Sequence, residues 1–326
     1  MQSSPEISTA RITLLQPRGG DGSSPVWVYA GHVAKVDGQP AAGDVVDVVT
    51  PNGRFYGRGF YNPHSKIRVR LLAFDETPID ESFWRERIRQ AIRLRKRVVS
   101  NSTAYRLIHG EGDRLPGLIV DRYDQTLVMQ TLAFGMDRRK ALLGEWLVQE
   151  TGASAVYLRN DAKSRTLEGL PLERGFLIGG GATKVEIAEG RAKFTVDVER
   201  GQKTGWFCDQ RENRLAAARY TEDAAVLEVF CHTGAFGIHA ALAGARSVEG
   251  LDVSEETLAL AQAHAEATQD AEREHVTPFI YWHPQRYRLR NVASPVALSH
   301  HRWTVDTPED YELVRRLFDH LLPTNP

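Results

Sequence analysis

Two apolar segments separated by a glycine turn and a helix constrain the fold of this chain most. Residues 225–230 are mostly apolar with one acidic interruption, Glu228, as expected for a buried parallel strand. Gly234 predicts a tight turn, 236–243 predicts a helix, and the next apolar segment ends at Asp252, 24 residues after Glu228. The sequence therefore predicts a parallel βαβ unit with a glycine in its first turn and a carboxylate at the end of its second strand.

The chemistry of this unit suits a nucleoside cofactor without phosphates. A glycine lets a cofactor approach the backbone closely, and a carboxylate at a strand end can accept hydrogen bonds from both ribose hydroxyls. The unit lacks the G-x-G-x-x-G fingerprint and so has no glycine-lined cradle for a pyrophosphate. We therefore expect S-adenosylmethionine (SAM) as the cofactor. The alternative is an ordinary βαβ crossover whose carboxylates, Glu228 and Asp252, are merely exposed at strand ends.

The overall charge does not indicate a nucleic-acid-binding chain. The 326 residues carry a formal net charge of -1, so any RNA contact must come from a local basic surface. No segment approaches the roughly 18 apolar residues of a membrane span, and residues 1–15 show no secretory signal. The two cysteines, Cys208 and Cys231, lack metal-site spacing and predict neither a metal site nor a disulfide framework. These features predict a cytoplasmic protein with no membrane partner.

Alternating apolar segments and turns predict an α/β multidomain fold. Short β segments at 26–29, 44–49 and 66–72 predict a small β-barrel. Further strands are predicted at 118–123, 156–160, 185–188 and 192–198, and a helix at 138–150. The predicted regions are a β-barrel over 1–78, a basic linker helix over 79–102, a central α+β domain over 103–200, half of a Rossmann-like domain over 201–270 and a tail over 271–326.

The linker helix has one apolar face and a strongly basic remainder. Asp80 predicts its N-cap, and the helix is expected from Ser82 to about Val99, with Trp84 and Ile88 on the apolar face. Positive charges occupy the other positions: Arg85, Arg87, Arg89, Arg93, Lys96 and Arg97. The helix is either a solvated linker or a helix that contacts nucleic-acid phosphates.

Three blocks of sequence carry a resemblance to a known family. They are Gly112–Tyr123, Gln202–Arg214 and Phe230–Phe236. With these blocks in this order, residues 26–268 resemble the PUA-domain-containing class I SAM-dependent methyltransferases that methylate cytosine C5 in large-subunit ribosomal RNA. The resemblance implies an N-terminal PUA-like barrel, a central α+β domain and a Rossmann-like methyltransferase domain.

The resemblance also implies which residues contact SAM. They are Gln202, Thr204, Phe207, Asp209, Arg211, Glu228, Gly234 and Asp252. Two positions depart from the family pattern: Glu228 stands where aspartate is expected, and Ala235 stands where a second glycine is usual. Each departure is expected to weaken cofactor binding, because each adds a carbon beside the cofactor.

The catalytic residues of that family have no counterpart in this sequence. Family members use an Asp-Pro-Pro segment to hold the base and a later cysteine to attack C6 of cytosine. No Asp-Pro-Pro segment follows Thr268, and no cysteine follows Cys231. Cys208 and Cys231 lie inside the cofactor blocks and are interpreted as packing residues. The catalytic residues are therefore unassigned, and we expect this chain to be weakly active or inactive.

The tail resembles a different family. Two segments, Arg273–Tyr281 and Arg302–Tyr311, carry this resemblance. With them, residues 272–326 resemble the C-terminal part of cytidylyltransferases of surface-polysaccharide biosynthesis, which implies that Asp306 is an active-site remnant. The alternative is a strand followed by an amphipathic helix with Leu313, Leu317 and Leu321 on one face. A junction at 268–272 explains both halves. With the junction there, only two strands of the Rossmann-like sheet remain. We expect the strand that contains Glu228 to have an uncovered apolar edge, because the strand that normally flanks it is missing.

These observations support three functions to different degrees. The first is a SAM-dependent methyltransferase of ribosomal RNA, with that RNA as partner. The second is an RNA-binding module without catalysis. A cytidylyltransferase fragment ranks last, because the nucleotide-binding loop of that family is absent. The sequence leaves open whether the chain forms a homodimer.

Overall fold

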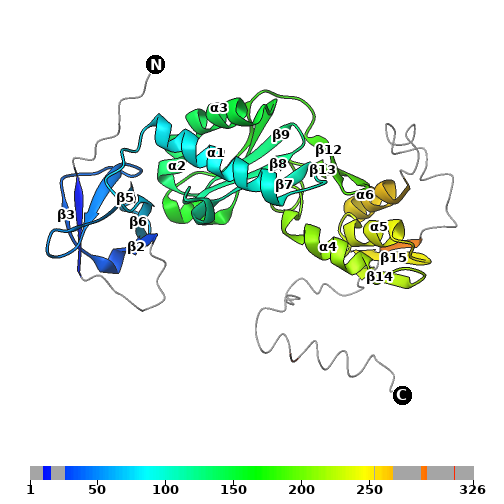
Figure 1. Cartoon of the computed structure of the whole chain (residues 1–326). Coiled ribbons are helices and arrows are strands. Elements are labelled where there is room, and N and C mark those ends of the chain that lie inside the picture. Colours follow the sequence, from blue (N-terminus) through cyan, green and yellow to red (C-terminus); the bar gives the residue numbers. More distant parts are fainter. Residues whose placement is uncertain (1–9, 16–25, 253, 267–287, 292–311, 313–326) are drawn as a thin grey trace.

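Three regions follow one another along the chain and lie in a row (Figure 1). The computed structural model describes residues 10–15, 26–252, 254–266, 288–291 and 312. An N-terminal sheet is followed by helix α1 (Glu81–Val98), a central sheet and a smaller parallel sheet. No helix within these ranges is long and apolar enough to cross a membrane.

The N-terminal region is a six-stranded sheet with the order β2-β6-β5-β4-β1-β3. Its elements are β1 (Arg11–Leu14), β2 (Trp27–Tyr29), the 3-10 helix η1 (Ala30–His32), β3 (Val33–Asp37), β4 (Val45–Val49), β5 (Phe55–Tyr61) and β6 (Ile67–Ala73). The three predicted segments correspond to β2, β4 and β6, whereas β1, β3 and β5 lie outside them. No ladder joins β2 to β3 among the described residues, so closure into a barrel stays a prediction.

Helix α1 begins and ends close to its predicted bounds. Asp80 is the N-cap, because its carboxylate accepts the Phe83 N–H at 3.0 Å. Trp84 and Ile88 are buried, as the apolar face predicts. Three of the six cationic side chains pair with acids of the protein: Arg85 and Arg89 with Glu150, and Arg93 with Glu86. The pairs link this helix to α3 (Lys140–Thr151) through Glu150, and both predicted roles, linker and phosphate contact, stay open.

The central sheet has five strands in the order β11-β10-β9-β8-β7. Its strands are β7 (Ala104–His109), β8 (Leu118–Tyr123), β9 (Thr126–Thr131), β10 (Ala155–Asn160) and β11 (Glu173–Ile178), with the 3-10 helices η2 (Gly110–Asp113) and η3 (Lys163–Glu168). The parallel pair β9–β10 is connected through α2 (Phe134–Arg138) and α3 (Lys140–Thr151). The single helix predicted at 138–150 is therefore wrong at its start, because the backbone leaves helical geometry at Arg139 (φ -106°, ψ 6°).

The two faces of the central sheet pack against different partners. One face packs on α1 and α3, and its core includes Ile88, Leu107 and Leu147. The other face packs on the hairpin β12 (Lys184–Glu189) and β13 (Ala192–Asp197), where Tyr123 meets Phe194. The same core continues into the third region, so the hairpin joins the central sheet to it.

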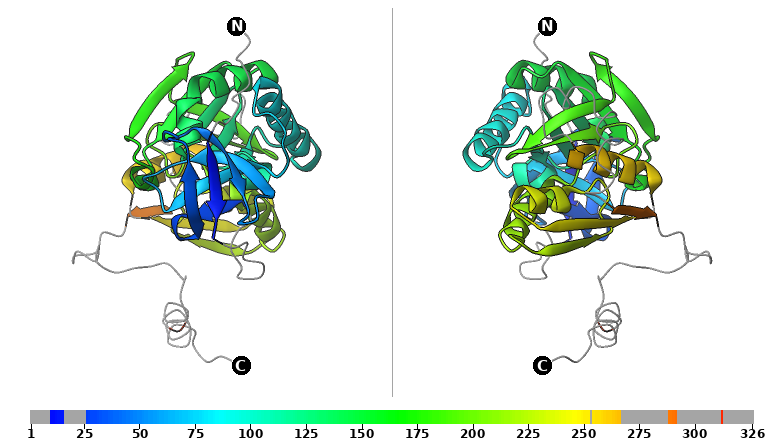
Figure 2. Two further views of the ribbon diagram at one scale, coloured as in Figure 1. Left: turned by 90° about the vertical axis from the view of Figure 1, so that its left-hand side faces the viewer. Right: turned by 90° about the vertical axis from the view of Figure 1, so that its right-hand side faces the viewer.

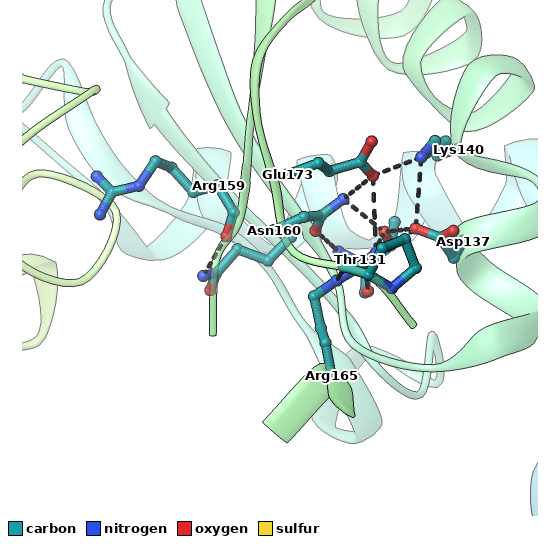
Figure 3. Close-up of polar contacts among 9 residues, drawn as sticks. Thr131, Asp137, Lys140, Arg159, Asn160, Arg165 and Glu173 are labelled. Carbon is teal, nitrogen blue, oxygen red and sulfur yellow. Dashed lines mark hydrogen bonds and ion pairs between the residues drawn. The ribbon is translucent and has the colours of Figure 1, made fainter. Parts of the chain in front are cut away.

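A buried polar network connects the strands at one end of the central sheet (Figure 3). The Arg165 side chain is fully buried and donates to Thr131 and to Asp137. Asn160 accepts the Thr131 N–H at 2.7 Å and donates to Glu173 at 3.0 Å. Buried polar groups need such partners, because an unpaired one costs about 1–3 kcal/mol. The network therefore ties η3 to the ends of β9, β10 and β11.

The same 3-10 helix also holds the N-terminal sheet. Its Glu168 accepts hydrogen bonds from Asn62 at 3.0 Å, Ser65 at 2.6 Å and Arg70 at 2.9 Å. Burial alone would raise the pKa of Glu168, but Arg70 and these hydrogen bonds lower it. η3 is thus anchored to both sheets, which places the N-terminal sheet firmly beside the central one.

The third region contains the predicted βαβ unit. It is a parallel sheet of β14 (Ala225–Val229), β15 (Ser247–Asp252) and β16 (Arg288–Asn291) with the order β14-β15-β16. Its helices are α4 (Arg211–Ala218), α5 (Ala235–Leu242) and α6 (Glu255–Glu266), preceded by the 3-10 helix η4 (Cys208–Gln210). The predicted strands and helices at 225–267 agree with β14, α5, β15 and α6.

The small sheet differs from its prediction in one strand. We expected two strands, but β16 adds a third at the edge of β15 (Figure 2). Among the described residues β14 pairs only with β15, so its other edge is uncovered, as predicted. Leu227 and Val229, two residues apart on one face of β14, are 58% and 51% exposed. Most of the tail predicted to resemble a cytidylyltransferase, including Asp306, Leu313 and Leu321, lies outside the described residues.

Candidate cofactor site

A pocket of about 470 Å³ lies between the strand ends of the parallel sheet and the loop before η4. This volume falls in the range of small-molecule sites, about 300–1,000 Å³. The pocket is lined by Gln202, Trp206, Phe207, Gln210, Arg214, Glu228, Phe230, Cys231, His232, Thr233, Ala235, Phe236 and Asp252. A neighbouring pocket of about 240 Å³ shares Gln202, His232, Thr233 and Asp252 and adds Ser254 and Thr257.

Asp252 ends β15 at the wall of both pockets. Its Oδ2 accepts the His232 N–H at 2.8 Å, and its Oδ1 accepts the Ser254 N–H at 3.0 Å. These bonds fix the carboxylate, while each oxygen can still accept another hydrogen bond. Asp252 therefore has the position and the free acceptor capacity that the predicted ribose contact requires.

Glu228 lies on β14 at the base of the pocket. Its carboxylate accepts the Gly237 N–H at 2.7 Å and the Phe236 N–H at 3.3 Å, both at the N-terminus of α5. Burial raises the pKa of Glu228 to about 7, although these two hydrogen bonds act in the opposite direction. Glu228 is thus a pocket residue whose charge changes near neutral pH.

The turn between β14 and α5 has a strained backbone. Phe230 and His232 have positive φ angles of 62° and 50°, and Gly234 has 71°. At Gly234 an added Cβ would lie 2.9 Å from the Cβ of Ala261, so the glycine is needed there. Left-handed backbone at non-glycine residues costs free energy and clusters at functional sites. The strain therefore marks this turn as part of a site.

The loop before η4 forms the opposite wall. Gln202 and Phe207 line the pocket together with Trp206. The Phe207 ring packs edge-on against His232, with ring centroids 5.5 Å apart, and the Lys203 ammonium lies 4.6 Å from its centroid. The two loops thus meet across the pocket.

Not all eight predicted contacts reach the pocket. Gln202, Phe207, Glu228 and Asp252 line it, and Gly234 lines a small adjoining cavity with Glu228. The side chains of Thr204, Asp209 and Arg211 are absent from its wall. Thr204 is buried against Asp121, Asp209 is 60% exposed and pairs with Lys203, and Arg211 pairs with Glu212. Each of these three side chains has a partner within the protein.

Several wall residues lie outside the set of predicted SAM contacts. They are Trp206, Gln210, Arg214, Phe230, His232, Thr233 and Phe236. All of them lie inside the resembling blocks, so the blocks themselves were the available signal. Arg214 is also buried and forms a bidentate ion pair with Glu189 at 2.6 Å. Burial alone would raise the pKa of Glu189, but hydrogen bonds from His239 and Arg214 lower it to about 2.

Both cysteines have the environment of packing residues. Burial raises the pKa of Cys231 to about 12, although this residue lies at the pocket wall. Burial also raises the pKa of Cys208 well above its usual value, and its Sγ lies 4.0 Å from the Tyr123 hydroxyl. A thiolate is the reactive form of cysteine, so neither thiol is prepared for nucleophilic attack.

Known proteins resemble this chain in sequence and in fold. The PUA-like domain family matches residues 24–74. The chain is 43% identical over 256 residues to the ribosomal RNA large subunit methyltransferase I of Shewanella amazonensis, covering 77% of this chain and 64% of that protein. The protein of the same name from Alteromonas mediterranea is 41% identical over 243 residues, covering 73% of this chain and 61% of that protein. The chain thus spans less than two thirds of the length of these relatives.

Solved structures show the fold alone. A Streptococcus mutans protein described as a SAM-dependent methyltransferase superposes with a TM-score of 0.66 at 18% identity, covering 87% of this chain and 70% of that one. A second protein described as a methyltransferase, solved with SAH, gives a TM-score of 0.64 at 20% identity, covering 86% of this chain and 66% of that one. The mixed α/β architecture, with its PUA-like N-terminal region, is therefore that of known methyltransferase-type structures.

Proposed function

We propose that this chain binds SAM and belongs functionally with the methyltransferases of large-subunit ribosomal RNA. The observation that carries the proposal is the pocket in which Asp252 and Glu228 face Gln202 and Phe207. The relatives that resemble the chain along 77% of its length bear the name of that activity. Both observations point to the same cofactor as the βαβ unit.

The residues present suit SAM. Asp252 would hold the ribose hydroxyls, and the aromatic side chains of Phe207 and Phe230 would cover apolar parts of the cofactor. The N-terminus of α5 packs closely against the Glu228 carboxylate. A Cβ added at Gly237 would lie only 2.8 Å from Oε2 of Glu228. When bound, SAM supplies an electrophilic methyl group on a sulfonium.

We further propose that the RNA substrate class is large-subunit ribosomal RNA, with cytosine C5 as the methylated atom. The PUA-like N-terminal region supports an RNA partner, and the resembling blocks support the cytosine-specific branch. A base must leave its stack to reach such a pocket. Phe230 follows β14 directly, is 69% exposed and lines the pocket, so its ring is available to contact such a base.

Transfer by this chain is proposed to be weak or absent. The two cysteines within these 326 residues, Cys231 buried and Cys208 half-buried, have raised pKa values. RNA binding without catalysis is the second candidate, and the match of the PUA-like domain family to residues 24–74 favours it.

The test is a calorimetric titration of the purified chain with SAM, followed by methyl transfer from labelled SAM to ribosomal RNA. Saturable binding near the micromolar range, about 8 kcal/mol, supports the cofactor site. Binding without transfer supports the RNA-binding candidate with a retained cofactor pocket. Absence of SAM binding would contradict the proposed function.

A further inference from the structure

Residues 201–207 form one wall of the pocket, and side chains of the central sheet hold this loop in place. Thr204 is 1% exposed and lies between Gln202 and Trp206, two residues of the pocket wall. Its hydroxyl lies 2.5 Å from Oδ2 of Asp121 and 2.8 Å from the hydroxyl of Tyr123. Asp121 and Tyr123 both belong to β8 of the central sheet.

The direction of these hydrogen bonds follows from chemistry. A carboxylate can only accept, so the Thr204 hydroxyl donates its single proton to Asp121. The Tyr123 hydroxyl must then donate to Thr204. Arg106 on β7 completes the chain with two bonds of 2.9 Å to the carboxylate of Asp121, which is fully buried. Charge-assisted bonds of this kind are stronger than neutral ones, so Thr204 is held firmly.

A second anchor holds the start of the same loop. Arg159 on β10 donates to the carbonyl oxygens of Val198 and Gly201, both at 3.0 Å. Figure 3 shows the Arg159 guanidinium pointing away from the network around Arg165. Both anchors thus come from the central sheet, and neither Asp121 nor Tyr123 lines the pocket.

The loop between the anchors needs help to keep its shape. Lys203 and Gly205, on either side of Thr204, have positive φ angles of 55° and 128°. A left-handed lysine costs free energy and persists only where the surroundings determine it. The hydroxyl of Thr204 supplies that constraint at the middle of the turn.

We propose that Asp121 and Tyr123 are positioning residues for the cofactor site, acting through the Thr204 hydroxyl. The central sheet then sets the geometry of Gln202, Trp206 and Phe207 before any cofactor binds. This proposal rests on the proposed function, since it deepens the description of the same pocket. It gives Thr204 a role other than the expected direct SAM contact, because its buried hydroxyl donates to Asp121 and accepts from Tyr123.

The test compares SAM affinity in four variants with that of the unchanged chain. Thr204→Val removes the hydroxyl at equal size and is expected to raise Kd about tenfold, as for a hydrogen bond to a charged group. Tyr123→Phe is expected to raise Kd about threefold to tenfold, as for a neutral hydrogen bond. Thr204→Ser keeps the hydroxyl, so its Kd should equal that of the unchanged chain. Tyr157→Phe, a buried tyrosine of β10 outside the network, should leave Kd unchanged.

The double variant Thr204→Val with Tyr123→Phe separates positioning from two independent effects. If Tyr123 acts through Thr204, the double variant binds no more weakly than Thr204→Val alone. Affinities equal to that of the unchanged chain in both single variants would overturn the proposal, and so would strictly additive losses.

Amide hydrogen exchange of residues 201–207 without cofactor provides a readout that does not depend on SAM binding. Faster exchange in Thr204→Val and Tyr123→Phe, but not in Tyr157→Phe, supports the anchor. Unchanged exchange overturns it. If the unchanged chain fails to bind SAM, the proposed function is contradicted. The exchange rates alone then show whether Asp121 and Tyr123 hold the loop through Thr204.

Discussion

Two carboxylates that the family resemblance assigns to the same cofactor have different surroundings. Asp252 lies at the wall of both pockets, and its oxygens are oriented by two backbone N–H groups. Asp209 has a 60% exposed side chain that pairs with Lys203 at 3.2 Å. Substitutions at Asp252 and Asp209 therefore show which of the two carboxylates contacts the cofactor.

We expect Asp252→Ala to weaken SAM binding by about 1.5–3 kcal/mol, the usual value of hydrogen bonds to a charged group. Asp209→Ala is the matched control and should change the affinity little, because its carboxylate faces solvent. Isothermal titration calorimetry measures both. Equal losses in the two variants would show that Asp209 contacts the cofactor directly, and an unchanged affinity in Asp252→Ala would reduce the βαβ unit to a structural role.

Glu228 should make stability depend on pH. The folded chain keeps its proton up to a pKa of about 7, whereas a free glutamate releases it near 4.5. Its contribution to stability is therefore complete below pH 4.5 and is lost as the pH rises through about 7. Glu228→Gln mimics the protonated form, so we expect the variant to gain stability relative to the unchanged chain between pH 5 and 8. Urea unfolding across this range measures the difference, and a constant difference would contradict the prediction.

At the scale of elements, His264 docks helix α6 on the hairpin β12–β13. Its Nε2 accepts the Thr195 N–H at 2.6 Å, so its Nδ1 carries the proton and donates to the Thr233 carbonyl at 3.2 Å. Burial lowers the pKa of His264 to about 4. The neutral ring thus connects β13, the pocket turn and α6.

We expect this docking to fail in acid. The contribution of His264 to stability is present above its usual pKa of 6.5 and is lost as the pH falls through about 4. The hydrogen-exchange protection factor of the Thr195 amide should fall across this window. In His264→Gln, which does not titrate there, the protection of Thr195 should change much less. Equal pH profiles in the two proteins would mean that another group controls the docking.

The strands of the N-terminal sheet show why some elements were missed. Gly57 and Gly59 interrupt the apolar pattern of β5, and in a sequence such glycines are typical of turns. In the structure an added Cβ at Gly59 would lie 2.1 Å from the Arg70 carbonyl oxygen. The glycine is present because β5 and β6 approach closely, which is a tertiary requirement with no local signature.

At the scale of the whole molecule, the chain combines a PUA-like N-terminal region with a pocket whose cysteine, Cys231, has a raised pKa. We expect no covalent adduct between the chain and ribosomal RNA, because burial raises the pKa of both thiols. Denaturing gel electrophoresis after incubation with RNA and SAM measures this directly. An adduct that disappears in Cys231→Ala and persists in Cys208→Ala would contradict the prediction and identify Cys231 as a nucleophile.

Local patterns in the sequence were sufficient for the elements that depend on neighbouring residues. The apolar runs and the turn glycine predicted β14, α5 and β15, and Asp80 predicted the start of α1, because strand periodicity, helix caps and tight turns are properties of a few consecutive residues. The resembling blocks likewise located the two loops that form the pocket. These features followed from the order of residues alone.

Tertiary structure decided which side chains of those loops face the pocket. Thr204 turns away because Asp121 and Tyr123, more than 80 residues earlier in the chain, hold its hydroxyl. Arg214 reaches the pocket wall because Glu189 from the hairpin pairs with it. The orientation of a buried polar side chain is set by the partner that satisfies it, and only the packing of the central sheet and the hairpin brings those partners into place.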